Sequence, residues 1–249
     1  MSGHSKWSTI KRKKGKADAQ RGKLFGKINR LISVAARNGG DPDANVELRN
    51  AIQLAKENNM PNENIERAIK KGTGEIEGVS YEEVTYEGYG PGGVAVLIEV
   101  LTDNRNRTVS EVRRIFTKHG GNLGSSGCVA WMFTKKALFV FDKGNIDQDT
   151  LLDVALEVEV DDIETDDKNI EITLSPTDFE KFKQIIDDNK IKYSVAEITM
   201  IPQTTVNLEG KKAEQMLSMM EQLEDNDDVQ NVYANFNIDE QIMEELSSQ

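Results

Sequence analysis

The chain has 249 residues, of which 30% are charged and 37% hydrophobic, enough for two or three domains with modest cores. No segment approaches the roughly 18 to 20 uninterrupted apolar residues of a membrane-spanning helix, and no apolar segment follows the polar N-terminus, so neither a membrane protein nor a secreted one is expected. The single cysteine, Cys128, excludes an internal disulfide and an all-cysteine zinc site and fits a reducing cytoplasm.

The net charge of −12 is distributed unevenly along the chain. Residues 1–37 hold eleven Lys and Arg against one acid, and residues 1–72 have a net charge of +9, whereas the remaining 177 residues have a net charge of −21. Such asymmetry predicts a basic segment that binds a polyanion. The alternative is a basic surface that is merely solvated, although the run from Lys11 to Lys16 has no local acid to neutralise it.

The first 72 residues predict three helices that form a small bundle. Apolar residues recur at three- and four-residue intervals from Leu24 to Ala35 and stop at Gly39-Gly40. A second apolar face runs from Leu48 to Ala55, and a third short helix follows Pro61. The basic residues between positions 11 and 23 are too densely charged to be buried, so we expect them to face solvent or a partner.

From about residue 81 the pattern predicts strands. Val94, Val96, Ile98 and Val100 recur at every second position after the turn Gly90-Pro91-Gly92-Gly93. A helix is expected from Val109 to Lys118, with Thr108 and Glu111 at capping-box spacing, followed by strands around 128–133 and 137–141.

The acidic segment 135–202 has the predicted order strand, helix, strand, strand, helix, strand, which is typical of a ferredoxin-like unit. The tail adds a strand at 205–208, a helix at 211–224 and a strand at 229–236, and we expect it to complete the sheet that begins near residue 81. The predicted fold is α+β, with an N-terminal three-helix bundle and two ferredoxin-like α+β domains, one inserted in the other. The expected domains are a basic helical domain at 1–78, a discontinuous α+β domain at 79–134 plus 203–249, and an inserted acidic ferredoxin-like domain at 135–202.

No arrangement of residues predicts catalysis. His4 and His119 lie in different regions, and His119 is expected to contact the last carbonyls of its helix. Cys128 lies in an apolar pattern typical of a core strand. The loop Gly88–Gly93 lacks the Lys-Ser/Thr ending of a phosphate-binding loop and precedes a strand. We therefore expect no enzyme, no cofactor, no metal and no small-molecule substrate.

The first candidate binding feature is a cluster of cations near the N-terminus. Trp7 lies beside this cluster, and its indole can either stack on a base or cover the bundle. The predicted nucleic-acid-binding residues here are Lys6, Trp7, Lys11, Arg12, Lys13, Lys14, Lys16, Arg21, Lys23 and Lys27.

The second candidate is the segment Asp103–Thr108, which directly precedes a predicted helix. Arg105 and Arg107, together with exposed backbone N–H groups, would form a phosphate clamp there. The alternative is that Asp103 and Asn106 form turn and cap hydrogen bonds while the arginines pair with nearby acids. Arg113, Arg114 and Lys118 extend the positive charge along the helix.

Several segments together resemble the YebC family, which includes the mitochondrial translational activator of cytochrome oxidase subunit one. The resemblance spans essentially the whole chain. It implies a helical N-terminal domain, two α+β domains, a cytoplasmic location and no known catalysis. The segments that carry it are Gly3-His4-Ser5-Lys6-Trp7, Gly39-Gly40-Asp41-Pro42-Asp43-Ala44-Asn45, Tyr86-Glu87-Gly88-Tyr89-Gly90-Pro91-Gly92-Gly93, Asp103-Asn104-Arg105-Asn106-Arg107-Thr108 and Lys118-His119-Gly120-Gly121-Asn122-Leu123-Gly124.

The resemblance implies two kinds of function, because the family is labelled both as DNA-binding transcriptional regulators and as ribosome-associated translation factors that relieve elongation stalls, notably at proline-rich stretches. Both functions need a polyanionic partner. The dense basic cluster lacks a clear set of base-reading residues, which favours backbone contacts and hence ribosomal RNA. We expect a ribosome-associated factor that contacts rRNA and also tRNA, and the alternative partner is double-stranded DNA.

Overall fold

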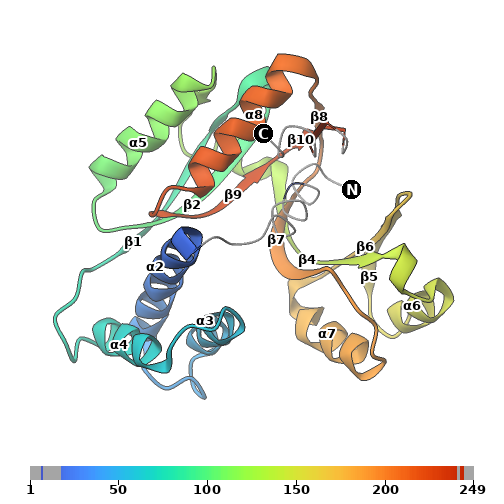
Figure 1. Cartoon of the computed structure of the whole chain (residues 1–249), viewed down its shortest axis with the longest axis horizontal. Helices are drawn as coiled ribbons and strands as arrows, with labels where there is room; N and C mark the ends of the chain where they lie inside the picture. The colour runs from blue at the N-terminus through green and yellow to red at the C-terminus, as the bar shows by residue number, and fades with distance from the viewer. Residues whose placement is uncertain (1–6, 8–17, 240–241, 244–249) are drawn as a thin grey trace. The chain divides into compact units, whose positions relative to one another are not determined.

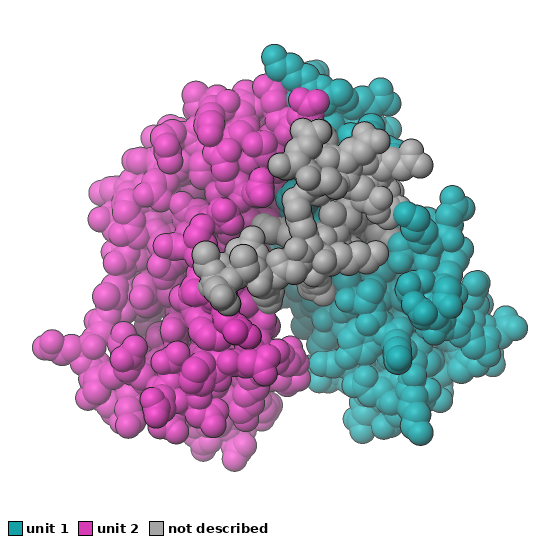
Figure 2. Space-filling model, viewed as in Figure 1, with its two compact units in different colours: residues 1–14, 129–213, 233–249 teal, residues 15–128, 214–232 magenta. Residues whose placement is uncertain are grey.

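The structure, a computed structural model, describes Trp7, residues 18–239 and residues 242–243. It has a mixed α+β fold in which helices precede two antiparallel sheets. The chain divides into two compact units, one of residues 15–128 and 214–232 and the other of residues 1–14, 129–213 and 233–249 (Figure 2). The three-domain boundaries expected from the sequence remain a prediction.

Three helices form the predicted N-terminal bundle: α2 (Asp18–Ala35), α3 (Val46–Glu57) and α4 (Asn62–Thr73) (Figure 1). Their shared core includes the fully buried Ile32 and Leu48. The amide of Asn45 donates to the carbonyls of Ala35 and Gly39, while its side-chain oxygen accepts from the Leu48 amide. One side chain therefore ends α2 and starts α3, because it satisfies backbone groups that both helix ends leave unpaired.

The first sheet has the order β3-β1-β2-β9. The turn predicted at Gly90–Gly93 joins β1 and β2, and Gly92 and Gly93 have φ of 75° and 83°, conformations that glycine adopts readily. A Cβ added at Gly88 of β1 would meet Phe116 of α5, and one added at Gly90, directly after β1, would meet Met216 of α8, so both helices cover the same face of the sheet (Figure 1). The elements are β1 (Glu82–Tyr89), β2 (Ala95–Thr102), α5 (Arg105–Lys118), β3 (Asn122–Leu123), α8 (Gly210–Glu224) and β9 (Val229–Ala234).

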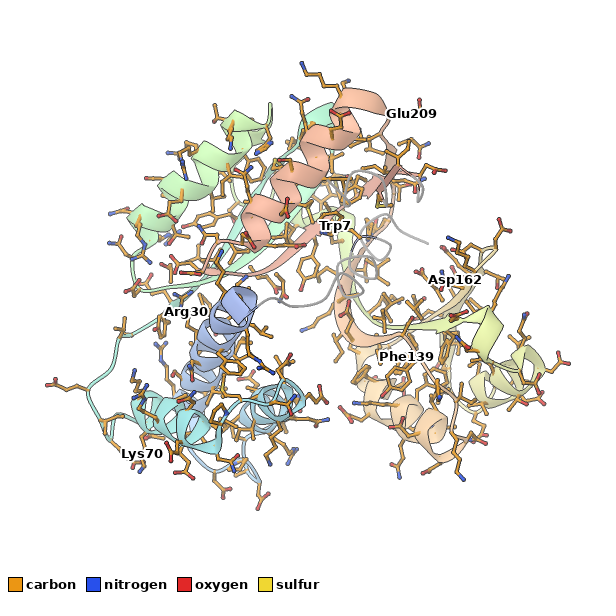
Figure 3. The ribbon with its side chains drawn as sticks, in the orientation of Figure 1. Trp7, Arg30, Lys70, Phe139, Asp162 and Glu209 are labelled. Atoms are coloured by element: carbon orange, nitrogen blue, oxygen red, sulfur yellow. The ribbon has the colours of Figure 1, made fainter. Side chains whose placement is uncertain are left out.

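The second sheet has the order β5-β6-β4-β7 with antiparallel neighbours, and helices α6 and α7 complete a strand-helix-strand-strand-helix-strand unit. This is the ferredoxin-like arrangement expected of the acidic segment. Phe139 lies at the centre of its core, with its ring 4.9 Å from that of Phe182 (Figure 3). The elements are β4 (Phe133–Asp142), α6 (Gln148–Ala155), β5 (Val160–Thr165), β6 (Asn169–Leu174), α7 (Phe179–Asp188) and β7 (Val195–Pro202).

The C-terminal tail follows the prediction in part. Strand β9 joins the first sheet, as expected. Strand β8 (Val206–Asn207) instead pairs in parallel with β10 (Phe236–Asn237) in a separate two-stranded sheet. The strand expected around 128–133 is also absent, because residues Ala130–Met132 form a single 3-10 turn and β4 begins only at Phe133.

Candidate nucleic-acid interface

Helix α5 is positioned by the segment Asp103–Thr108. The side chain of Asn104 accepts a hydrogen bond from the Arg107 amide at 3.0 Å and so forms the N-cap, and the helix begins at Arg105. The expected capping box of Thr108 and Glu111 is therefore wrong. Thr108 lies one turn inside the helix and is buried. Its hydroxyl donates a hydrogen bond to the carboxylate of Asp228.

The solvent face of α5 is basic. The apolar face includes Val112 and Phe116, both fully buried, and the opposite face exposes Arg113 and Arg114. Glu111 is the only acid of the helix, and it accepts a hydrogen bond from Asn226 at 2.8 Å. The exposed polar residues beside the two arginines are Asn106, Ser110, Thr117 and Lys118.

Arg107 does not extend freely from this face. Its guanidinium forms ion pairs with Asp103 at 2.8 Å and with Asp228 at 2.7 Å. These ion pairs raise the pKa of Arg107 above its ordinary value, so it stays charged. Arg105 is exposed and has no ion pair within the described part of the chain. The structure thus supports the alternative interpretation for Arg107, which pairs with nearby acids, and the phosphate clamp stays a prediction.

Asp228 is a buried carboxylate that gathers several donors. It accepts from the Thr108 hydroxyl at 2.6 Å and from the Thr102 hydroxyl at 3.2 Å, and its second oxygen lies 3.3 Å from the Arg30 guanidinium (Figure 3 labels Arg30). Burial alone would raise the pKa of Asp228. The hydrogen bonds from Arg107 and Thr108 and the charge of Arg30 outweigh burial and leave that pKa below its ordinary value.

The cations on α2 also have intramolecular partners. Lys23 lies 3.6 Å from Asp225, and the ammonium of Lys27 donates to the Glu224 carbonyl at 2.6 Å. Lys27 therefore pairs with the negative end of α8, where a cation is favourable. Lys23 and Lys27 therefore each have an intramolecular partner, and their role in nucleic-acid binding stays a prediction. Arg21 is exposed, as predicted.

Trp7 is buried, with 6% of its surface exposed (Figure 3). A buried indole offers no open face to a base, which argues against stacking in this arrangement. Trp7 belongs to the unit of residues 1–14, 129–213 and 233–249, which does not contain the bundle, so its expected role as a cover of the bundle stays a prediction. The sequence-predicted residues Lys6, Lys11, Arg12, Lys13, Lys14 and Lys16 lie outside the described residues.

Two further sequence predictions concern single side chains. His119 caps the C-terminus of α5, where its backbone amide donates to the carbonyls of Ile115 and Phe116, and its side chain is buried. Cys128 lies in a loop and is half-buried rather than a core residue of a strand. Burial and the nearby Glu87 raise the pKa of the Cys128 thiol, which keeps it protonated at neutral pH.

Sequence reasoning missed two residues. Asp228 belongs to the acidic run 224–228, which resembles an ordinary solvated turn, and only its position directly before an apolar strand distinguishes it. Trp131 was not singled out, although it is 68% exposed. The sequence predicted a strand around residues 128–133, and strands usually bury large aromatic rings.

Comparison with known proteins decides the family. The N-terminal domain of TACO1/YebC proteins matches residues 5–75, and the TACO1/YebC second and third domains match residues 81–236. The chain belongs to the TACO1/YebC family. Members from Syntrophus aciditrophicus and Trichlorobacter lovleyi are 60% and 61% identical over at least 99% of this chain and all of their own length. Both are named probable transcriptional regulatory protein.

A solved structure supports the same assignment. The conserved hypothetical protein Aq1575 from Aquifex aeolicus is 47% identical to this chain and superimposes with a TM-score of 0.78, covering 90% of this chain and 93% of its own. Within the described residues, no group of three or more His, Cys, Asp and Glu is placed to hold a metal ion. No helix in that part of the chain is long and apolar enough to cross a membrane.

Proposed function

We propose that this family member is a non-catalytic, cytoplasmic, nucleic-acid-binding regulator of gene expression, and that it works as a ribosome-associated translation factor that relieves elongation stalling, for example at proline-rich stretches. The observation that carries the proposal is the basic solvent face of α5. Arg113 and Arg114 are exposed there and have no ion pair to any described residue, whereas the chain beyond residue 72 has a net charge of −21. A local positive face on an otherwise acidic surface favours a phosphate backbone as its partner.

Among the described residues, the proposed binding surface consists of this helix face and Arg105 at its N-terminus. The basic run between Lys11 and Lys16 is proposed as a second binding segment. Long cationic side chains of this kind contact phosphates and carry little sequence information. Ribosomal RNA, with tRNA beside it, offers folded phosphate backbones that need no sequence reading. The acidic remainder of the chain repels nonspecific nucleic acid and limits contact to the basic surface.

A DNA-binding transcriptional regulator is the second candidate. Its support is the name of the relatives, together with Asn106 and Arg113 on the exposed face of α5, because Asn and Arg are side chains that read base edges in the major groove. Such a regulator should prefer its operator by about 10³ or more over bulk DNA.

Co-sedimentation with ribosomes at near-physiological salt, with and without excess double-stranded DNA, tests the proposal. The protein should pellet with ribosomes despite the DNA, and the variant Lys11→Glu/Arg12→Glu/Lys13→Glu/Lys14→Glu should remain in the supernatant. Complete displacement by DNA would transfer support to the transcriptional candidate, and an operator search would follow. Pelleting of the variant to the same extent as the wild-type chain would remove the basic run from the interface.

A further inference from the structure

Strand β7 forms one edge of the second sheet, whose order is β5-β6-β4-β7 (Figure 1). Its eight residues pair with β4 in one continuous register, and directly after the strand the Gln203 amide donates to the Met132 carbonyl. Hydrogen-bonded pairs alternate along an antiparallel ladder, so counting back from Gln203 assigns every second residue to the bonds with β4. The backbone groups of the residues between them, Ala196, Ile198 and Met200, therefore point away from the sheet.

These outward backbone groups have no hydrogen-bond partner among the described residues. The side chain of Ile198, in the middle of the row, is 42% exposed. The strand has one charged residue, Glu197, its only proline is the last residue, and its register with β4 contains no bulge. Charges, prolines and bulges are the features that usually prevent a further strand from pairing at an edge, so the β7 edge is open to strand addition.

The opposite edge of the same sheet, strand β5, has the protective features that β7 lacks. The amide of Ile163 donates to the carboxylate of Asp162 at 2.9 Å, so it is not available to another strand. The register with β6 shifts between Val160 and Asp162, and the exposed acids Asp161 and Glu164 add charge to the edge. The sheet is therefore protected against strand addition at one edge and open to it at the other.

The charge of the surrounding segment indicates which strand fits. Residues 135–202 hold eight Lys and no Arg against seventeen Asp and Glu, a net charge of −9. A second copy of this chain would bring the same negative charge to the edge, and nucleic acid would bring phosphates, so both are repelled. A basic polypeptide is attracted by this charge, and its backbone supplies the donors and acceptors that the outward groups of β7 need.

We propose that the β7 edge binds an extended basic segment of a partner protein as an added strand. The backbone of the segment bonds to Ala196, Ile198 and Met200. Side chains of an added strand alternate between the two faces of the sheet, so every second one is apolar and packs beside Ile198, and those between are Lys or Arg on the face of Glu197. The inference goes beyond the proposed function, because it assigns a protein contact to the unit that does not contain α5.

The test uses the full chain and a synthetic peptide in which lysine and valine alternate, with binding measured by calorimetry. Ile198→Lys places a cation on the open edge. Ile163→Lys is the matched control, because Ile163 is 38% exposed on the opposite edge strand and the change in charge is identical. Ile198→Lys should weaken peptide binding by about tenfold or more, and Ile163→Lys by less than about twofold. Equal losses would overturn the proposal, because the peptide would then be attracted only by the net charge.

Amide hydrogen exchange, followed by NMR on the wild-type chain, provides a second measurement. The peptide should slow exchange at Ala196, Ile198 and Met200 and leave Ile163 unchanged, and protection confined to other amides would contradict the site.

Two further outcomes would overturn the partner assignment. Protection of the β7 amides without peptide that rises with protein concentration would identify a second copy of this chain as the occupant. Protection without peptide that is lost in Lys11→Glu/Arg12→Glu/Lys13→Glu/Lys14→Glu would identify the chain's own basic run. No ribosome or DNA is present in these experiments, so their failure is distinct from failure of the proposed function.

Discussion

Arg107 and Asp228 lie 121 residues apart in the chain, yet the guanidinium Nη2 contacts the carboxylate Oδ2 at 2.7 Å. The Asp228 side chain is 4% exposed and the Arg107 side chain 43% exposed, so the acid is the buried member of the pair. The same carboxylate also faces Arg30 of α2. A single residue thereby ties the helical bundle and α5 to the turn before β9.

Replacing Asp228 by Asn should destabilise the protein by about 2–4 kcal/mol, because two arginines and two threonine hydroxyls lose their shared acceptor charge in a buried setting. Urea unfolding at neutral pH measures this free energy. Asp103→Asn is the matched control, since it removes a second carboxylate from the same arginine at the surface, where an ion pair contributes less than about 1 kcal/mol. Equal effects of the two substitutions would contradict the role of Asp228.

Acidification should reproduce the loss of the Asp228 charge. The folded-state pKa of Asp228 is lowered, so the stability it contributes is fully present above the ordinary aspartate pKa of about 4 and is lost as the pH falls through the lower folded value. The stability difference between the wild-type chain and Asp228→Asn should therefore be constant near neutral pH and shrink below about pH 4. Urea midpoints of both chains across this range check the prediction, and a difference that grows on acidification would have the wrong sign.

The close packing of α4 against α2 predicts opposite effects of two alanine substitutions. A Cβ at Gly72 would lie 2.3 Å from the Ser33 carbonyl oxygen, so Gly72→Ala should destabilise the bundle by about 1–3 kcal/mol. Gly22 lies within α2, and no atom of the described residues is within 4 Å of the corresponding position, so Gly22→Ala should stabilise the chain by up to about 1 kcal/mol. Thermal unfolding of the two variants tests this contrast. Destabilisation by both, or by neither, would disagree with the packing.

Local patterns predicted most elements of the fold. Apolar spacing placed the three N-terminal helices and the strand-helix-strand-strand-helix-strand unit of the acidic segment, since helix and strand periods are local properties of the sequence. The glycines and the proline of residues 90–93 likewise predicted the turn between β1 and β2. The strand expected at 205–208 is present as β8, but its parallel pairing with β10 was beyond this reasoning, because each of these strands is only two residues long and depends on the other for pairing.

The candidate site was less predictable, because charge alone does not indicate which cations are already paired. Arg107 and Arg113 are both basic residues of α5, but only Arg107 has a carboxylate brought to it from residue 228. That pairing depends on the tertiary position of β9. Thr108 was misassigned for the same reason: its spacing fits a cap, and its buried hydrogen bond to Asp228 appears only in the folded chain.

Ribosome co-sedimentation of Arg113→Glu/Arg114→Glu directly tests whether the basic face of α5 binds nucleic acid on the ribosome, as we propose. Lys211→Glu/Lys212→Glu is the matched control, because it makes the same charge change at two adjacent exposed lysines in the first turn of α8, where acids are tolerated well. The α5 variant should lose at least about tenfold in ribosome affinity with an unchanged unfolding midpoint, and the control should lose less than about threefold. Equal binding by the α5 variant and the wild-type chain would contradict the claim.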